Sequence, residues 1–373
     1  MLTALSLFSG AGGMDIGIRQ AGFDILVDIE IDPYCCLTLR SAIQREQLKT
    51  VLLEQDIQQV DPSNLMRELN LKSGELDLLF GGSPCQSFSQ AGKHSSLDDE
   101  RGLLLFEFIR FAKYFYPKVI VMEQVKGFLK ALDTSGKIGG VCELLKSELQ
   151  NLGYRFNLQI INAADYGVAQ LRERVFIVAT RIGGSFNFPL PTHSKVDSQF
   201  SLFPLQNYVT VGQVIKGLDT PSRDKENLRE DSHIDVTTEG DRKRIHGVTE
   251  GSFLAKELHL PLSQRCKLTK KDTTKFRRLS FSQPSLTLRC GEIFFHPVED
   301  RYLTPREYMR IHGYPDSYLL KGPVRSRSGR VRHLDQHRQI ANSVPPPVAC
   351  AIALEISKFL MKSEPSQQEL VSA

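Results

Sequence analysis

Hydrophobic residues in the first half of the chain fall into short uninterrupted runs, separated by segments in which they recur at helical spacing. Such runs are typical of strands that are covered on both faces of a parallel sheet. They predict strands at residues 4–8, 25–29, 51–53, 76–80, 118–122, 156–161 and 174–180. The helical spacing predicts helices at residues 14–21, 34–44, 101–115 and 141–152. This alternation predicts an α/β domain with a mostly parallel sheet.

The pattern changes after Arg181, where proline, serine, threonine and charged residues replace the helical spacing until about residue 280. An apolar helix that ends near Leu360 resembles core and is expected to return to the first domain. With 373 residues, the chain exceeds the ~250–300 at which a single core stops growing. We therefore predict one domain from 1–183 together with 336–373, and a smaller, mostly irregular or β domain at 184–335.

Composition indicates a globular chain without a membrane span. Hydrophobic residues make up 41% of the chain, and no apolar run approaches the ~18 residues that a span needs. The cysteines include no C-x-x-C pair and the histidines show no metal-ligand spacing, so we expect no bound metal and a reducing, cytoplasmic compartment. The net charge is only +4, so a polyanionic partner must contact a local patch.

Two basic segments are candidates for such a patch. One contains Arg265, Lys267, Lys270, Lys271, Lys275, Arg277 and Arg278, and the other contains Arg325, Arg327, Arg330, Arg332 and Arg338. Clusters of this kind are typical either of contacts with a phosphate backbone or of a solvated surface, and the sequence leaves both interpretations open.

Candidate chemistry begins with a cysteine that follows the apolar run at 76–80. Ligands of parallel sheets gather beyond the carboxyl ends of the strands, so Cys85 lies where chemistry is expected, although a buried structural cysteine is the commoner case. Glu123 ends the next predicted strand and so lies beside it. Arg172 and Arg174 alternate in an extended segment and share one face, either at this edge or as solvated charges.

A glycine-rich turn at residues 9–13 follows the first strand and opens the first helix. Glycine permits close approach of the backbone to a ligand, and the helix N-terminus offers unpaired N–H groups. A dinucleotide fingerprint fails because Asp15 occupies the position of its last glycine. Nucleotide-binding folds place a carboxylate for ribose hydroxyls ~20 residues after the glycine-rich turn, and Glu30 lies at this distance. Asp56 is placed to accept a hydrogen bond from an exocyclic amine. The turn and Glu30 also have plainer interpretations, as a tight turn and a solvated strand end.

Taken in order, these segments resemble the motifs of the DNA cytosine-5 methyltransferase family, in its bacterial restriction-modification type. The resemblance covers nearly the whole chain. It rests on Leu7 to Gly13, Glu30, Asp56, Pro84-Cys85-Gln86, Glu123-Gln124-Val125, Gln170 to Arg174, Arg277 to Arg289 and Gln339 to Val344. One departure is Gln124, which stands where the family usually has asparagine and lengthens the amide side chain by one methylene.

The resemblance implies a Rossmann-like domain that binds S-adenosylmethionine on a seven-stranded, mostly parallel sheet, and a separate target-recognition domain. It implies that Cys85 attacks C6 of a flipped cytosine, that Glu123 acts at N3, and that Arg174 contacts O2. Arg172 and Arg174 would supply a positive field for the thiolate, and the loop 84–102 would close over the base. The implied cofactor-binding residues are Phe8, Ser9, Gly10, Ala11, Gly13, Glu30, Ile31, Asp56, Ile57, Pro84, Leu104, Asn342 and Ser343.

The same resemblance implies a monomer in the bacterial cytoplasm that methylates one cytosine within a specific site of double-stranded DNA and so protects it from a cognate restriction endonuclease. Three alternatives are less well supported. The missing third glycine disfavours an NAD-dependent oxidoreductase. The presence of Cys85 and Glu123 disfavours a DNA-binding module that has lost catalysis. The long segment from Arg181 to Lys275 is better explained by readout of duplex DNA than by a tRNA substrate.

Overall fold

The structure is a computed structural model of the chain, and it describes residues 1–84, 104–195, 205–224, 229–254, 276–325 and 333–363. A seven-stranded sheet lies at its centre, in the order β3-β2-β1-β4-β5-β8-β6. The first five of these strands are parallel, whereas β8 runs antiparallel to both β5 and β6. The strands are β1 Leu2–Leu7, β2 Phe23–Glu30, β3 Val51–Glu54, β4 Leu78–Gly81, β5 Val119–Val125, β6 Arg155–Asn162 and β8 Glu173–Thr180. The predicted α/β fold with a mostly parallel seven-stranded sheet is confirmed.

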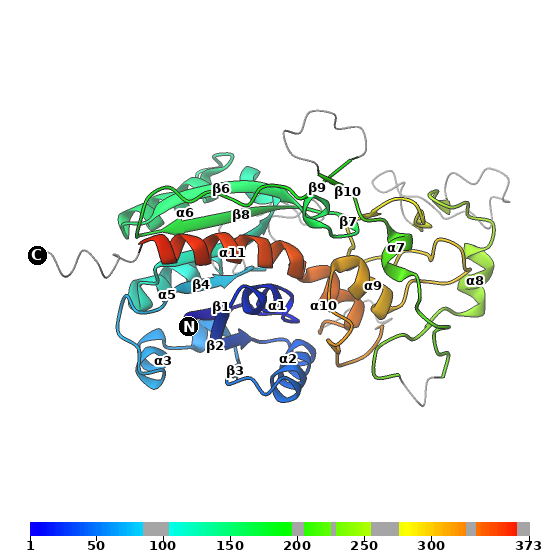
Figure 1. Ribbon diagram of the computed structural model, residues 1–373, viewed down its shortest axis with the longest axis horizontal. Coiled ribbons are helices and arrows are strands. Elements are labelled where there is room, and N and C mark those ends of the chain that lie inside the picture. The colour runs from blue at the N-terminus through cyan, green and yellow to red at the C-terminus, as the bar shows by residue number, and fades with distance from the viewer. Residues whose placement is uncertain (85–103, 196–204, 225–228, 255–275, 326–332, 364–373) are drawn as a thin grey trace, which may run out of the picture.

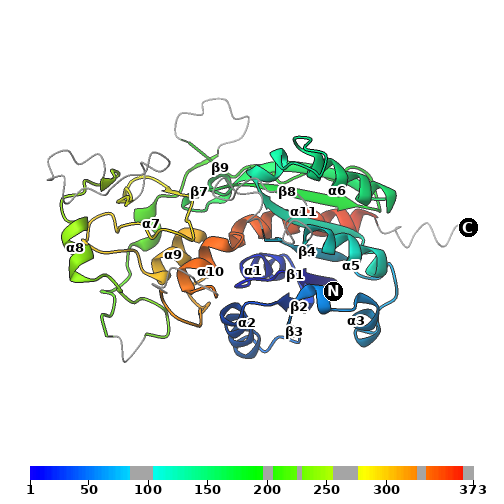
Figure 2. The ribbon, with the colours of Figure 1, turned by 180° about the vertical axis from the view of Figure 1, so that it is seen from behind.

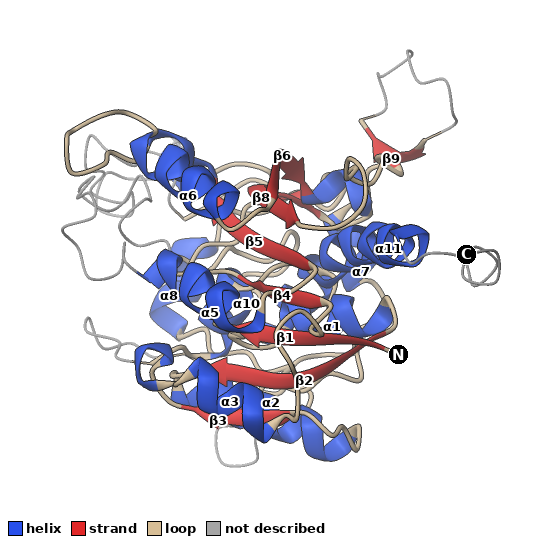
Figure 3. Ribbon diagram, turned by 90° about the vertical axis from the view of Figure 1, so that its left-hand side faces the viewer, coloured by secondary structure: helices blue, strands red, loops and turns tan. Residues whose placement is uncertain are grey.

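Helices cover both faces of this sheet, which explains why its strands are apolar on both sides (Figure 3). One face packs against α3, α5 and α6, with Leu65, Phe108 and Leu145 in a shared core. The other face packs against α1 and α11 through Ile18 and Ile352. The helices are α1 Gly13–Gln20, α2 Pro33–Arg45, α3 Pro62–Glu68, α5 Glu107–Phe115, α6 Gly140–Asn151 and α11 Pro346–Ser363, and short 3-10 turns occupy Ile57–Gln59, Leu104–Phe106, Lys126–Lys130 and Ala163–Tyr166.

The C-terminal helix α11 returns to the first part of the chain and lies alongside α1 (Figure 1). A stretch that includes it, Gln336–Lys362, is long and apolar enough to cross a membrane, but 56% of its apolar window is buried inside the protein. The core helix of a globular protein has the same properties, so this stretch is weak evidence for a span.

The region between Arg181 and α11 forms a second body of short elements beside the sheet (Figures 1 and 2). Its core contains Val211, Ile245, Phe295 and Tyr308, and the same cluster includes Ala11 of the glycine-rich turn. The elements here are α7 Val211–Ile215, α8 Glu239–Ile245, α9 Pro305–His312, α10 Gln336–Asn342, and the two-residue strands β9 His193–Ser194, β10 Gln206–Asn207 and β11 Ser285–Leu286. The strand β11 pairs with the two-residue strand β7 Gln170–Leu171, which precedes Arg181. The body is therefore mostly irregular, and its core extends to the glycine-rich turn in the first part of the chain.

One member of the basic segments does not fit a role in phosphate contact. Arg278 is buried; its guanidinium donates hydrogen bonds to Asp300 at 2.6 Å and to the carbonyl oxygens of Ile245 and His296. It therefore stabilises the second body from inside. Residues 265–275 and 326–332 lie outside the described part of the chain.

Candidate active site

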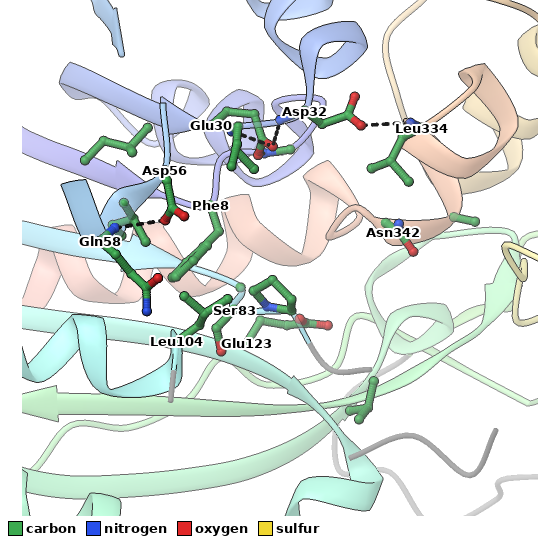
Figure 4. Close-up of a pocket in the computed structure, with 18 of the residues that line it drawn as sticks. Phe8, Glu30, Asp32, Asp56, Gln58, Ser83, Leu104, Glu123, Leu334 and Asn342 are labelled. Carbon is green, nitrogen blue, oxygen red and sulfur yellow. Dashed lines mark hydrogen bonds between the residues drawn. The ribbon is translucent and has the colours of Figure 1, made fainter. Parts of the chain in front are cut away.

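The carboxyl ends of the parallel strands open onto a cavity of about 490 Å³. Its walls come from the turn after β1, the end of β2, the segment after β3, and the ends of β4 and β5 (Figure 4). Segments near the C-terminus close one side, where Leu334 and Asn342 reach it. Open α/β sheets bind ligands at this edge because the loops there approach one another and carry free side chains.

The turn after β1 is strained where it faces the cavity. Phe8 has a φ of 56°, in the left-handed region that costs a non-glycine residue about 1–3 kcal/mol, and its side chain lines the cavity. The Glu30 carboxylate holds this turn, because it accepts a hydrogen bond from the Gly10 N–H at 2.7 Å. It also accepts from the N–H groups of Ile31 and Asp32, at 3.0 and 2.8 Å. Burial raises the pKa of Glu30, and these three N–H groups act in the opposite direction.

Two of the glycines in the turn are needed for close packing. A Cβ atom on Gly12 would lie 2.6 Å from the Tyr318 hydroxyl, and one on Gly13 would lie 2.6 Å from the Tyr314 hydroxyl. Gly10, with a φ of 56°, has open space on the corresponding side and lines the cavity. Glycine therefore permits close approach in two places. Gly10 opens the backbone to the cavity, and Gly12 and Gly13 allow Tyr318 and Tyr314 to pack against the turn.

Two aspartates fix the other walls of the cavity. Asp56 accepts a hydrogen bond from the Gln58 N–H at 3.0 Å, which orients its carboxylate at the cavity wall (Figure 4). Asp32 caps α2 by accepting from the N–H groups of Tyr34 and Cys35. Its second oxygen accepts from the Leu334 N–H at 2.9 Å, so one carboxylate connects the end of β2 to a segment 302 residues away.

Glu123, at the carboxyl end of β5, pairs with Arg174 at the start of β8, with 3.0 Å between Oε1 and Nε. Burial raises the pKa of Glu123, while Arg174 and Arg172 lower it less strongly, so the carboxyl holds its proton to a higher pH than usual. Gly82 lies beside it: a Cβ atom there would lie 3.1 Å from Glu123 Oε2. The described residue that precedes Cys85 in sequence, Pro84, lines the same cavity.

Gln124 ties this strand to the turn that leads to Cys85. Its side-chain amide donates hydrogen bonds to the carbonyl oxygen of Ser83, at 3.2 Å, and to the Ser83 hydroxyl. The longer side chain of glutamine therefore has a defined partner here.

The sequence matches the family of C-5 cytosine-specific DNA methylases over residues 2–358. The chain belongs to this family. A relative from Haemophilus parahaemolyticus, the Type II methyltransferase M1.HphI, is 32% identical over 365 residues, which is 96% of this chain and 87% of that protein. The Type II methyltransferase M.Eco47II of Escherichia coli is 32% identical over 370 residues, 96% of this chain and 80% of that protein.

Solved structures share the fold at lower identity. A protein described as a DNA modification methyltransferase encoded within an E. coli prophage has a TM-score of 0.68 at 21% identity, over 97% of this chain and 100% of that one. The methyltransferase EhMeth of Entamoeba histolytica has a TM-score of 0.57 at 16% identity, over 96% and 99% of the two chains. The predicted family is thus confirmed, and the protein is a DNA (cytosine-5) methyltransferase. The oxidoreductase alternative is wrong.

Most site residues predicted from the sequence of this enzyme meet at two adjoining cavities. Those that line the large cavity are Phe8, Gly10, Glu30, Ile31, Asp56, Ile57, Pro84, Leu104, Glu123, Arg172, Arg174 and Asn342. Ser9, Gly13 and Ser343 line a smaller cavity of about 40 Å³ beside it. Ala11 lines neither, because it is buried and its carbonyl accepts a hydrogen bond from Tyr318. Cys85 and residues 85–102 of the expected lid lie outside the described residues, so the nucleophile and the lid stay predictions.

Arg172 has a second function in the enzyme that its alternation with Arg174 does not indicate. Its guanidinium donates to the carbonyl oxygens of Ala341 and Ser343, at 2.9 and 3.0 Å, and so holds the turn around Asn342 at the cavity. His312, on α9, supports the same turn by donating from Nε2 to the Ser343 carbonyl at 3.0 Å.

Sequence reasoning missed Asp32, Gln58, Ser83 and Leu334, all of which line the large cavity. Asp32 carried a detectable signal, since an aspartate before a proline is a typical helix N-cap. Leu334 carried none, because only tertiary contact brings it to the large cavity.

Proposed function

We propose that the enzyme binds S-adenosylmethionine in the 490 Å³ cavity and transfers its methyl group to C5 of a cytosine in double-stranded DNA. The observation that carries this proposal is the joining, in one cavity, of a glycine turn and two strand-end acids with the Glu123–Arg174 pair. The first group suits a nucleoside with an amino-acid tail, and the second suits a pyrimidine ring.

The residues of the cavity fit this cofactor. Glu30 Oε1 accepts from Ile31 and Asp32, but Oε2 accepts only from Gly10 and keeps a free lone pair, so it can accept a ribose hydroxyl. Asp56 uses one oxygen for the Gln58 N–H, which leaves the other for an exocyclic amine. The N-terminus of α1 and the turn around Asn342 offer N–H groups and an amide for the amino-acid end. When bound, the cofactor supplies an electrophilic methyl group.

The chain's own residues then activate the cytosine. C5 is a weak nucleophile until a thiolate adds to C6, and Cys85, next to Pro84, is the residue assigned to that step. Glu123 donates its proton to N3, so negative charge does not remain on the ring; its raised pKa supports this function. Arg174 holds the Glu123 carboxyl and is close enough to the same pocket to polarise the base. Loss of the C5 proton, departure of the Cys85 thiolate and return of the N3 proton to Glu123 complete the reaction.

The second body is assigned to recognition of the DNA target, at 184–335. We further propose that the protein acts as a monomer in the bacterial cytoplasm, paired with a cognate restriction endonuclease. The relatives are Type II methyltransferases, which supports this pairing. A flipped cytosine costs a few kcal/mol of unstacking, and contacts from the second body would offset it.

The deciding experiment replaces Cys85 with serine and maps 5-methylcytosine at base resolution in DNA treated with each protein. Wild type should methylate one cytosine within a defined site. Cys85→Ser should give no methylation yet bind S-adenosylmethionine with unchanged Kd in calorimetry. Methylation by the serine variant would disprove the nucleophile, and failure of wild type to bind the cofactor would disprove the assigned cavity.

A further inference from the structure

Two carboxyl groups lie side by side in the interior beneath the glycine turn. Asp15, in the first turn of α1, and Asp28, on β2, are both fully buried. In the described part of the chain, no backbone N–H and no side-chain N–H or hydroxyl group donates to any of their four oxygens. The Asp15 carboxyl lies close enough to raise the pKa of Asp28, and a hydrogen bond between the two requires one of them to carry a proton.

The surroundings favour one shared proton. Arg19, also on α1, approaches Asp28 with 3.5 Å between Nη2 and Oδ2, so the neighbourhood contains one cation. Burial and the Asp15 carboxyl both raise the pKa of Asp28, while Arg19 lowers it less. Tyr314 and Tyr318 also face this region, and burial raises the pKa of each, so both are neutral. A pair with one proton, together with Arg19, has no net charge.

Asp15 also forms part of the wall of the 40 Å³ cavity. That space is large enough for at least one water molecule. Its other polar walls are Ser6, Ser9, Glu123, Asn342 and Ser343. It shares Phe8, Gly10, Gly82, Glu123 and Asn342 with the large cavity. An unpartnered buried carboxyl therefore faces a small polar space that adjoins the site assigned to the amino-acid end of the cofactor.

We propose that Asp15 and Asp28 form a proton-linked binding site for the positively charged amino group of the cofactor, reached through the small cavity. The arriving cation breaks the shared O–H bond, and the proton leaves to solvent. Two carboxylates then balance two cations, Arg19 and the amino group. The N-terminus of α1 supports the ionised form, since Asp15 occupies its first turn. This inference rests on the proposed binding of S-adenosylmethionine.

The test is isothermal titration calorimetry of the wild-type protein in buffers of different ionisation enthalpy, which counts the protons exchanged on binding. It is done at a pH where the ligand's α-amino group, with a pKa of about 7.7–8.0, stays protonated. S-adenosylmethionine and S-adenosylhomocysteine are compared, because both carry the amino group and only the first carries a sulfonium. We expect release of up to about one proton per ligand, equal for the two.

Matched variants separate this pair from other titrating groups of the site, such as Glu30. Asp15→Asn and Asp28→Asn should each abolish the proton release and remove the pH dependence of Kd. In wild type, Kd should change by about tenfold for each unit by which ligand binding shifts the pKa of the pair. Asp24→Asn, on the same strand but away from the cavity, should retain both. Thermal unfolding of the two pair variants establishes that they fold, and the comparison of the two ligands on wild type does not depend on any variant.

Three results would overturn the inference while the proposed function stands: binding of both ligands without proton release, release with S-adenosylmethionine alone, or undiminished release in folded Asp15→Asn. Failure of wild type to bind either ligand would instead overturn the proposed function itself.

Discussion

At the scale of single residues, opposing effects set the protonation of Glu123. Burial raises its pKa, and the guanidinium groups of Arg174 and Arg172 lower it less. The net rise keeps the carboxyl protonated, and able to donate to a base nitrogen, at a pH where an exposed glutamate is ionised. The arginines limit this rise, which in the proposed mechanism allows the acid to release its proton.

The pH dependence of methyl transfer should report this balance. Turnover should fall as pH rises through the pKa of Glu123, because only the protonated form donates. Arg174→Gln removes the largest lowering effect, so the alkaline fall should move to higher pH while the rate itself decreases. Single-turnover rates across pH measure both effects, with Arg155→Gln on β6 as the control. An alkaline fall at the same pH in Arg174→Gln and wild type would show that another group controls it.

Gln124 should matter for the turn that leads to Cys85. Gln124→Leu keeps the bulk of the side chain but removes the donor to Ser83, whose buried carbonyl then lacks this partner. The expected loss in free energy of unfolding is about 1–3 kcal/mol, measured by urea denaturation, with turnover reduced more than cofactor affinity. Gln159→Leu, on an exposed position of β6, should change stability by less than ~0.5 kcal/mol. Equal effects of the two substitutions would contradict the tie to Ser83.

Residues that follow predicted strands could be placed from the sequence, because strand ends of a parallel sheet share one edge. Glu30, Asp56 and Glu123 were found in this way, and all line the large cavity. Leu334 and the carbonyl contacts of Arg172 could not be found, because they depend on how the chain returns over the turn after β1.

At the scale of elements, the close contact of α1 and α11 depends on one glycine. A Cβ atom on Gly17 would lie 2.6 Å from Ala349 Cβ, and closer still to the backbone of Pro346 and Cys350. The backbone of α11 cannot move away without disturbing the core that it shares with the sheet. A small residue at position 17 therefore determines how near the C-terminal helix lies.

Gly17→Ala should destabilise the protein by about 1–3 kcal/mol or more, because overpacking outweighs the gain in helix propensity. Gly240→Ala, within α8, is the matched control: its Cβ would meet no atom within 4 Å, so stability should rise slightly. Chemical denaturation of both variants measures the difference. A Gly17→Ala protein as stable as Gly240→Ala would mean that the two helices separate freely.

Most strands of the sheet were predictable because an apolar run ends at a clear stop, although β3 and β4 span only four residues each. The predicted helix at 34–44 is α2, whose start follows from the Asp32 cap and Pro33. The elements of the second body could not be predicted in this way, because its helices and strands are short. Its core also contains residues far apart in sequence, such as Val211 and Tyr308. Short elements of this kind carry too few residues to show a period.

At the scale of the whole molecule, the second body and the sheet are joined through a common core. Tyr314 and Tyr318, which follow α9, pack against the glycine turn, and the Tyr318 hydroxyl donates to the Ala11 carbonyl at 2.9 Å. The segment that follows α9 therefore supports the turn that lines the large cavity, although it belongs to the predicted recognition domain 184–335. Residues before 276 lack these contacts with the turn in the described part of the chain, which makes them the better candidates for interchangeable target readout.

An exchange of residues 184–275 for the matching segment of a relative with another target should therefore move the methylated site and leave the chemistry intact. The chimera must keep apolar residues at Val211, Ile215 and Ile245, because these side chains pack into the core that α9 and α10 share. Base-resolution mapping of 5-methylcytosine reads the new site, and cofactor Kd should stay as in wild type because the cavity lies outside the exchange. An exchange limited to α3 is the control and should leave the site unchanged. If the 184–275 chimera methylates the original site, base readout lies in residues 276–335, and the two functions of the second body are not separable along the chain.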